Sequence, residues 1–472
     1  MRSTRIVRAT LLMAAALAAL LFYRAGTPRS PSQDGRVNVV LVSLDTLRPD
    51  HLGIYGHTRP TSPCIDAFAR DAIVFENAFA QAGWTLPSHL SMLTSLYSSG
   101  HGVTGDEHRL GRGIRTLPET LQQQGYDTAA FTAGHFVSRR YGFDRGFDVY
   151  EEEYDDRPPN HGQGWRFESL EGDLFAWLDD HADRAFFVFV HAYDTHEPFI
   201  AHDGASDFTS DYAGPMRALE NHDAFVRSGL REKYEARSAN DLFNINGFLG
   251  QVINQGRIDL SEQDVEHLIA LYDNEIRFVD TSICRLVEKL DSLGLRDETL
   301  MILTSDHGQE LMERGHGHIR HGTLYDEVVH VPLIVRIPDT APARSTKLVQ
   351  IVDIPPTVLA ALGLPPDPQF RGLPLLPLDT PGHPFVIAEG RGEKMLRTAT
   401  TKLLARPRGI ALYDLVADPG ESVDLAATKP DDVRALHRLL LDTLDRAELD
   451  PAERVELSEK DRAQLRALGY LD

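Results

Sequence analysis

Residues 37–45 have the sequence VNVVLVSLD, an uninterrupted apolar run that ends in an aspartate. Such a run, without polar alternation, is typical of a strand buried on both faces of a parallel sheet. Further runs of this kind predict strands at residues 126–133, 185–190, 300–304 and 331–337. Between them, helical spacing or a proline at the first turn predicts helices at residues 87–96, 170–182, 261–293 and 353–362. This alternation predicts an α/β fold: a three-layer, mostly parallel sheet flanked by helices.

The chain is predicted to have a main domain and a smaller one after it. Residues 37–380 form the main α/β domain, in which irregular stretches at 151–168 and 200–258 are expected to be loops that shape a substrate cleft. The pattern then changes to short strands with one helix near 430–446. Residues 381–472 are therefore predicted to form a small C-terminal α+β subdomain.

The N-terminus has the pattern of a bacterial export signal. Arginines at positions 2, 5 and 8 precede an uncharged stretch at residues 9–23, which Arg24 closes. A basic start before about 7–15 apolar residues is typical of a signal peptide, whereas a membrane span usually needs about 20. Residues 1–36 are predicted to be a signal peptide, or a retained signal anchor, plus a linker. The protein is expected to be exported, either periplasmic or anchored by this segment to the cytoplasmic membrane, facing outward.

The composition excludes several classes of function. The chain of 472 residues has 70 acidic and 48 basic side chains, a net charge of −22 that repels the nucleic-acid backbone. No nucleic-acid partner is therefore expected. Cys64 and Cys284 are too few for a disulfide scaffold or a multi-thiolate zinc site. They could form one disulfide or remain as two buried free thiols.

Acidic residues follow three of the predicted strands. Asp45, Asp194 and Asp306 each stand at or just beyond a strand end. Because ligands gather at the carboxyl ends of parallel strands, these side chains are expected to share a site. In the sequence SDHG at residues 305–308, a carboxylate and an imidazole can turn toward one divalent cation. Mixed oxygen and nitrogen ligands suit Zn²⁺ or Mn²⁺ better than Ca²⁺.

Thr85 stands just before the predicted helix at residues 87–96. The dipole and free N–H groups of a helix N-terminus favour an anion at this place. A hydroxyl here can become an alkoxide if a metal lowers its pKa, and the alkoxide can attack an ester of a tetrahedral oxyanion. The alternative is that Thr85 only caps the helix.

Two segments are rich in histidine. They contain His316, His318 and His321 among glycines, and His191 and His196 beside Asp194. The first group could ligate a metal, bind an oxyanion or protonate a leaving group, with a solvated loop as the alternative. The second group could hold a second metal or bind the substrate, with a structural role for His191 as the alternative.

These segments, in this order, resemble the sulfatases of the alkaline phosphatase superfamily over essentially the whole chain after the linker. The matching stretches include NVVLVSLDTLRPDHLGIYG (38–56), TLPSHLSMLTSLYSSGHGV (85–103), HAYDTHEPF (191–199), TLMILTSDHGQEL (299–311) and HGHIRHGTLYDEVVHVPLIV (316–335). The resemblance implies an alkaline phosphatase-like fold and a metal-dependent ester hydrolase. It also implies that Asp45, Asp306 and His307 bind the metal and that Thr85 occupies the nucleophile position.

The sequence departs from the sulfatase pattern at four positions. Sulfatases carry a cysteine or serine nucleophile that is oxidised to formylglycine, and Thr85 cannot give that aldehyde. The arginine that follows is His89 here, the second aspartate of an Asp-Asp pair is Thr46, and a catalytic lysine is His321. A threonine is similar to the phosphodiesterases, phosphoglycerol transferases and phosphoethanolamine transferases of the superfamily, in which its oxygen attacks phosphorus and binds the metal.

These resemblances lead to one predicted mechanism. A divalent cation, Zn²⁺ or Mn²⁺ with Ca²⁺ as an alternative, polarises Thr85, which attacks the phosphorus or sulfur of an ester. His196, His321 and His316 hold oxygens or protonate the leaving group. A second ion could bind between Asp194, His196 and His321.

The favoured function is a hydrolase or transferase of phosphate or phosphodiester esters. The substrate is expected to be a small-molecule, glycan or lipid ester. The first alternative is a sulfate-ester hydrolase that works without formylglycine. The second is a catalytically silent binding protein that keeps the fold.

Overall fold

The computed structural model describes residues 35–153, 166–197, 260–314 and 319–444, together with 199, 202, 208–209, 212–214, 216, 452–455, 457–458 and 462. The predicted targeting segment and most of the predicted loop at 200–258 lie outside the described residues. So do residues 315–318, which include His316 and His318.

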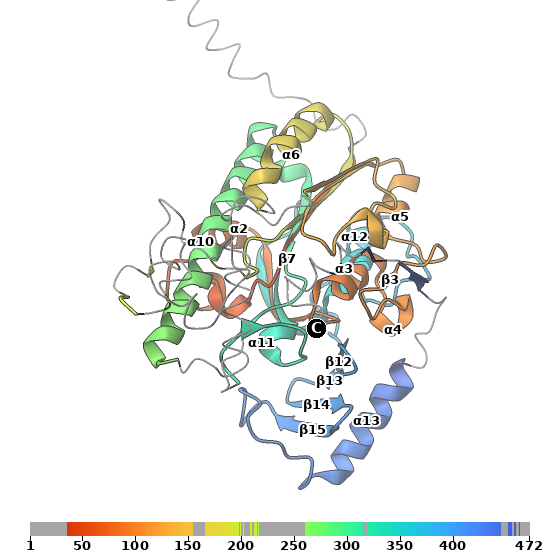
Figure 1. The fold of residues 1–472 in the computed structure, drawn as a ribbon. Coiled ribbons are helices and arrows are strands. Elements are labelled where there is room, and N and C mark those ends of the chain that lie inside the picture. Colours follow the sequence, from red (N-terminus) through yellow and green to blue (C-terminus); the bar gives the residue numbers. More distant parts are fainter. Residues whose placement is uncertain are drawn as a thin grey trace, which may run out of the picture.

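An eight-stranded sheet forms the centre of the main domain (Figure 1). Its order is β11 (Ala343–Gln350), β2 (Ile73–Phe79), β10 (His330–Arg336), β7 (Thr299–Thr304), β1 (Asn38–Leu44), β6 (Phe186–Ala192), β4 (Asp127–Ala133) and β5 (Val149–Glu153). Neighbouring strands are parallel except for β10, which is antiparallel to both β7 and β2. The predicted mostly parallel sheet is confirmed.

The predicted strands correspond to β1, β4, β6, β7 and β10, whereas β2, β5 and β11 were not predicted. The stretch 151–168, predicted as a loop, begins with the end of β5 and includes the start of helix α6 at Phe167. β5 has an exposed and half-buried acidic end, so it lacks the apolar run by which buried strands are recognised.

Helices cover both faces of the sheet (Figure 1). One face carries α2 (Pro63–Ala69), α6 (Phe167–His181) and α10 (Glu262–Ser292), and the other carries α3 (Thr85–Thr94), α5 (Leu117–Gln123) and α12 (Ile354–Ala361). Short elements complete the domain: α4 (Ser98–His101), α11 (Asp326–Val329), β3 (His108–Arg109), β8 (Glu310–Leu311), β9 (Ile319–Arg320) and β16 (Glu453–Arg454). Helix α10 begins at a capping box between Ser261 and Asp264, and its buried apolar residues keep the predicted spacing of three and four.

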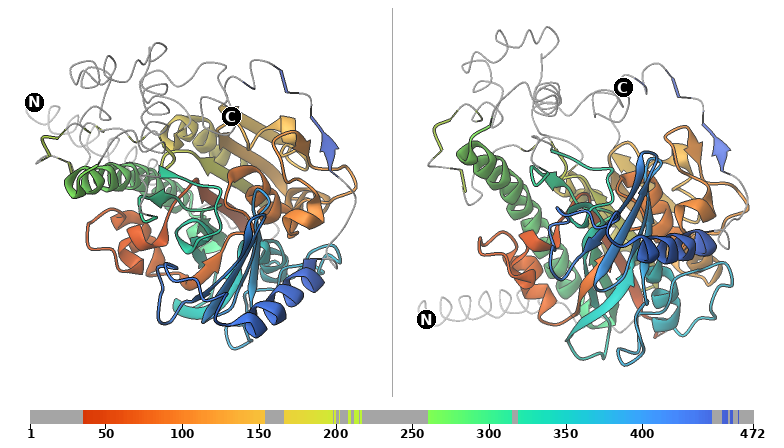
Figure 2. Two further views of the ribbon diagram at one scale, coloured as in Figure 1. Left: turned by 60° about the horizontal axis from the view of Figure 1, so that its bottom comes forward. Right: turned by 90° about the horizontal axis from the view of Figure 1, so that it is seen from below.

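A separate antiparallel sheet follows in the C-terminal part. It contains β12 (Val386–Glu389), β13 (Lys394–Arg397), β14 (Thr401–Arg406) and β15 (Gly409–Asp414) in sequence order. Helix α13 (Pro430–Leu444) lies against this sheet (Figure 2), where Leu440 packs with Leu396 and Leu403. The α+β subdomain is thus present, while its boundary at residue 380 stays a prediction.

Cys64 and Cys284 form a disulfide, with their Cα atoms 5.3 Å apart. The bond joins α2 to α10 across 220 residues of sequence. The alternative of two free thiols is therefore wrong.

Of the helices in the described part of the chain, none is both long and apolar enough to cross a membrane.

Candidate active site

Four predicted site residues come together at the carboxyl ends of two neighbouring strands. Asp45 follows β1, and Asp306 and His307 follow β7, which pairs with β1 in parallel. His307 Nε2 lies 3.3 Å from Asp306 Oδ2 and 3.8 Å from Asp45 Oδ1. The Thr85 hydroxyl lies 3.4 Å from both Asp45 Oδ2 and His307 Nε2. The predicted meeting of strand ends with the start of a helix is observed.

The ligand set fits a divalent cation. Asp45, Asp306 and His307 are fully buried, and their ligand atoms lie within 4.8 Å of one another. Within the described part of the chain, the buried atoms Asp45 Oδ1 and Asp306 Oδ2 have no hydrogen-bond partner, which is costly for a carboxylate unless a cation compensates it. Two carboxylates, an imidazole and a nearby hydroxyl are ligands that Zn²⁺ or Mn²⁺ accepts.

The two carboxyl groups respond differently to their surroundings. Burial, followed by the negative charge of Asp45, raises the pKa of Asp306 to about 6. Burial also opposes ionisation of Asp45, but the hydrogen bond from His191 and the charges of His196 and His307 hold its pKa well below the usual range. Two negative charges in one buried space repel each other, and this explains why the two pKa values shift in opposite directions. A cation between the carboxylates would reduce the repulsion.

Thr85 is the first residue of helix α3, and the N-cap is Trp84. The alternative in which Thr85 caps the helix is wrong, because its hydroxyl faces Asp45 and His307. The helix begins two residues earlier than predicted, with Pro87 inside its first turn. The backbone before it is packed closely: a Cβ on Gly83 would overlap the carbonyl oxygen of Thr323, so glycine is required there.

His89 occupies the position where sulfatases carry arginine. Its Nδ1 lies 3.0 Å from the Thr85 carbonyl oxygen and 3.3 Å from Asp306 Oδ2, and its Nε2 lies 3.0 Å from Ser43 Oγ. Burial, followed by the charge of His191, keeps the pKa of His89 well below its usual value. A neutral imidazole thus links the Thr85 backbone, Asp306 and Ser43 next to the ligand set. No role was predicted for His89 or Ser43. The available signals were that His89 follows Thr85 by four residues on the same helix and that Ser43 lies on β1 two residues before Asp45.

His191 lies near Asp45 Oδ2, the same oxygen that faces the Thr85 hydroxyl. Its Nδ1 donates to the Ala133 carbonyl oxygen at 2.7 Å, and its Nε2 lies 3.4 Å from Asp45 Oδ2. The hydrogen bond fixes the ring, so its second nitrogen stays directed at the carboxylate.

Two more histidines extend the site beyond His307. The His321 ring is stacked on His307, with centroids 4.9 Å apart, and meets His196 edge-on at 4.9 Å. Burial, then the charges of His307 and His196, keep the pKa of His321 well below its usual value. Glu197 completes a second group of metal-type ligand atoms with these two histidines.

Asp194 does not join that second group as the sequence suggested. Its Oδ2 accepts the Phe167 N–H at 2.8 Å, at the start of α6, and its Oδ1 lies 4.0 Å from Arg166. The charged guanidinium and the helix N-terminus together draw the carboxylate away from His196 and His321.

Thr46, at the position of the usual second aspartate, also points elsewhere. Its hydroxyl donates to the Thr195 carbonyl oxygen at 2.7 Å, and its backbone is left-handed, with φ 58°. It therefore offers no carboxylate and no free hydroxyl to the metal position.

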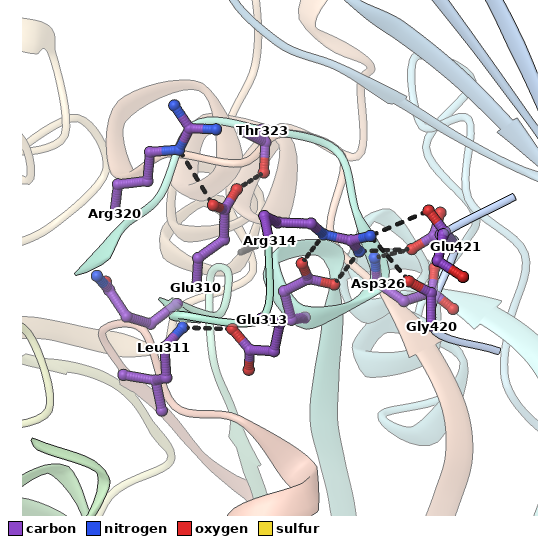
Figure 3. A network of polar contacts seen from close by, with 12 residues as sticks. Glu310, Leu311, Glu313, Arg314, Arg320, Thr323, Asp326, Gly420 and Glu421 are labelled. Carbon is purple, nitrogen blue, oxygen red and sulfur yellow. Dashed lines mark hydrogen bonds and ion pairs between the residues drawn. The ribbon is translucent and has the colours of Figure 1, made fainter. Parts of the chain in front are cut away.

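The loop that carries His321 is anchored on both sides, as Figure 3 shows. Glu310, 1% exposed, accepts hydrogen bonds from Arg320 Nε at 3.1 Å and from Thr323 Oγ1 at 2.5 Å. On the other side, Arg314 pairs with Glu327 and with Glu421 of the C-terminal part. The carboxylate of Glu310 thus ties together the residues before and after His321.

Comparison with known proteins shows which family this chain matches. The family model described as Sulfatase matches residues 37–364. An N-acetylglucosamine-6-O-sulfatase of Bacteroides thetaiotaomicron is 24% identical over 77% of this chain and 74% of its own. Arylsulfatase K of Gallus gallus is 26% identical over 92% of this chain and 86% of its own.

Solved structures share the fold. A phosphonate monoester hydrolase of Agrobacterium radiobacter has a TM-score of 0.68 at 22% identity and covers 90% of this chain and 99% of its own. A second solved protein, bound to its substrate D-glucosamine-2-N,6-O-disulfate, has a TM-score of 0.68 at 21% identity. The match covers 87% of this chain and 98% of that protein's chain. At these identities the likeness establishes the architecture.

Proposed function

The chain belongs to the sulfatase family and is a hydrolase, and we propose that it cleaves phosphate, phosphodiester or related phosphorus esters with Thr85 as nucleophile. The observation that carries this proposal is the Thr85 hydroxyl, 3.4 Å from both Asp45 and His307. A divalent cation held by Asp45, Asp306 and His307 would supply the positive charge that lowers the pKa of this hydroxyl and balances charge on the phosphoryl oxygens.

The chain's own residues divide the remaining work. The Thr85 oxygen attacks phosphorus as the bond to the leaving oxygen breaks, and a phosphothreonine ester forms. His321, with His196 beside it, gives a proton to the leaving oxygen, and a bound anionic ester favours the protonated imidazole. Water, or an acceptor hydroxyl, then attacks phosphorus and returns the Thr85 hydroxyl. We assign His316, which lies outside the described residues, to the same group.

Phosphorus is favoured over sulfur because of the nucleophile. A formylglycine hydrate can expel sulfate by elimination through its second hydroxyl, whereas a threonine ester must be hydrolysed by water. Hydrolysis of the covalent intermediate by water suits a phosphothreonine better than a sulfothreonine.

Sulfate-ester hydrolysis is the second candidate, since curated relatives are named as glycan sulfatases. A catalytically silent binding protein would be expected to have lost its ligands, but Asp45, Thr85, Asp306 and His307 meet here. A glycan, lipid or other small-molecule ester remains the proposed substrate class.

Export is part of the proposal. The Cys64–Cys284 disulfide persists in oxidising compartments outside the cytoplasm. The basic and apolar N-terminal sequence supports a cleaved signal or a retained anchor.

The test is a substrate panel. The purified protein, loaded with Mn²⁺ or Zn²⁺, is assayed with nitrophenyl phosphate, bis-nitrophenyl phosphate, a phenylphosphonate monoester and nitrophenyl sulfate. We expect kcat/KM for the best phosphorus ester to exceed that for the sulfate by about 100-fold or more, a difference of roughly 2.7 kcal/mol in barrier. A faster sulfate reaction, absent from Thr85→Ala, would establish the second candidate instead.

A further inference from the structure

Thr46 has a backbone conformation that a threonine rarely adopts. Its φ is 58°, in the left-handed region, where a β-branched side chain is strained. Such a conformation persists only where the surrounding structure holds it, and it is found mostly at functional sites. The residue directly follows Asp45 and is fully buried. Contacts made by the turned backbone should therefore explain why the conformation is kept.

Two buried side chains from neighbouring segments hold this conformation. The Thr46 hydroxyl donates to the carbonyl oxygen of Thr195 at 2.7 Å, and the Thr195 hydroxyl donates to the carbonyl oxygen of Asp45. From helix α10, the Tyr272 hydroxyl donates to the Thr46 carbonyl oxygen at 2.8 Å and accepts the Arg48 N–H at 2.9 Å. Thr46, Thr195 and Tyr272 are all 0% exposed. The turn after β1 is thus fixed both to the loop that follows β6 and to α10.

The left-handed turn directs the Thr46 N–H at the second carboxylate of the site. This N–H donates to Asp306 Oδ1 at 3.4 Å. The other oxygen, Asp306 Oδ2, lies 3.3 Å from His307 Nε2 and has no hydrogen-bond partner in the part of the chain that the structure describes. One carboxylate oxygen is thus held by backbone, and the opposite oxygen faces the other ligands. Hydrogen bonds of this kind, made to a ligand and not to the metal, orient the ligand and change metal affinity.

We propose that Thr46 is a positioning residue, which sets the arrangement of the Asp45 and Asp306 carboxylates for a cation without binding the cation itself. The inference rests on the proposed function, in which these carboxylates hold a divalent cation. The sulfatases that this chain resembles carry the second aspartate of a pair at this position. Here the side chain faces the Thr195 carbonyl oxygen, which suits a hydroxyl donor and not a carboxylate.

The test measures the affinity of the metal-free protein for Mn²⁺ by calorimetry, at a temperature where circular dichroism shows every variant to be folded. The variants are Thr46→Val, which keeps the shape and loses the hydroxyl, Thr46→Ser, which keeps the hydroxyl, and Thr46→Asp. The control is Thr299→Val. Thr299 is also buried and donates to a backbone carbonyl oxygen at 2.7 Å, but it begins β7, at the opposite end of that strand from Asp306.

Thr46→Val should weaken Mn²⁺ binding by about tenfold or more, the size of effect that loss of a contact behind a metal ligand usually has. Thr46→Ser has a hydroxyl that can make the same hydrogen bond, so its affinity should be close to that of wild type. Thr299→Val should lose stability but bind Mn²⁺ as wild type does. Equal affinities of Thr46→Val and Thr299→Val would assign Thr46 a purely structural role and overturn the proposal.

Thr46→Asp separates a positioning role from a ligand role. A carboxylate at this position would face the carbonyl oxygen of Thr195, and two acceptors cannot share a hydrogen bond. This variant should therefore also bind Mn²⁺ about tenfold more weakly than wild type. Tighter binding would show that a side chain at position 46 reaches the cation and would overturn the proposal.

The affinities are measured without turnover, which separates this result from failure of the proposed function. If wild type binds Mn²⁺ but cleaves no ester of the panel, the proposed reaction is wrong. The comparison of Thr46→Val with Thr299→Val still decides the role of Thr46 in that case.

Discussion

The hydroxyl oxygen of Thr85 lies 3.4 Å from the carboxylate oxygen Oδ2 of Asp45, although forty residues separate them in sequence. One residue begins a helix and the other ends a strand, so the fold alone brings them together. Both side chains are buried at 1% exposure or less. This pair makes the threonine a nucleophile candidate and not a helix cap.

Replacement of Thr85 by alanine should abolish turnover and leave the fold intact. We expect kcat/KM to fall by about 10³-fold or more, since alanine has no hydroxyl with which to attack the ester. Thr85→Ser keeps the oxygen and should retain measurable activity. The assay uses the best substrate of the panel, and circular dichroism checks folding. Activity near wild type in Thr85→Ala would exclude the nucleophilic role.

Metal removal should affect both activity and stability. Asp45 Oδ1 and Asp306 Oδ2 have no hydrogen-bond partner among the residues that the structure describes, so a cation is expected to stabilise the native state. At about 100 times its Kd a bound ion adds about 2.7 kcal/mol. Dialysis against a chelator should lower the melting temperature and stop turnover, and Mn²⁺ or Zn²⁺ should restore both.

Elemental analysis of the same samples gives the number of ions. Asp306→Asn should lower metal content, whereas Asp194→Asn, a carboxylate held instead by Phe167 and near Arg166, should keep it. Full activity in a metal-free protein would contradict the ligand set.

Much of this site follows from local sequence patterns. The apolar runs of β1 and β7 are continuous, and Asp45 and Asp306 come directly after them. Because parallel strands end at the same edge of a sheet, these two patterns were enough to predict that the acids meet.

Other features depend on contacts that no local pattern contains. The pairing of β2 with β10 and β11 joins segments far apart in the sequence, and sheet neighbours are set by tertiary packing. Glu197 replaces Asp194 in the second ligand group because Arg166 and the start of α6 hold Asp194 elsewhere. Arg391, which belongs to the predicted C-terminal subdomain, lies over the ring of Trp84 in the main domain.

Loss of Glu310 should impair protonation of the leaving group. Glu310 accepts hydrogen bonds from Arg320 and Thr323, on either side of His321. In Glu310→Ala we expect alkyl esters, which need a proton on the leaving oxygen, to lose about 10–100-fold more rate than nitrophenyl esters, which do not. Glu310→Gln keeps a carbonyl oxygen that can accept these hydrogen bonds, so its loss of rate on alkyl esters should be smaller. An equal loss on both esters would indicate general unfolding of the loop.

Removal of the disulfide should lower stability without changing the chemistry. The bond between Cys64 and Cys284 closes a loop of 220 residues, and loss of such a cross-link costs about 2–5 kcal/mol. The double variant Cys64→Ser/Cys284→Ser should unfold at lower denaturant concentration than wild type. Its kcat at low temperature should be unchanged. A reducing agent should shift wild type toward the variant and leave the variant unaffected.

Asp280 should make stability fall as the pH rises through the weakly acidic range. Its carboxylate, on α10, accepts the N–H groups of Cys64 at 3.0 Å and Ile65 at 2.8 Å. Burial outweighs these bonds and raises the pKa of Asp280 to about 6, from a usual value of 3.8. The fold therefore favours the protonated acid, and the cost of ionising it appears between about pH 4 and pH 6.

The comparison with Asp280→Asn isolates this effect, since the amide is uncharged at every pH. Relative to wild type, the stability of the variant should increase by about 1–3 kcal/mol as the pH rises across that range. Denaturation midpoints measured at several pH values test it, with the exposed Asp432→Asn as a control for net charge. The prediction is wrong if the stability difference between variant and wild type stays constant with pH or grows toward acid pH. Either result would mean that the N–H groups of α2 outweigh burial and that Asp280 is ionised throughout.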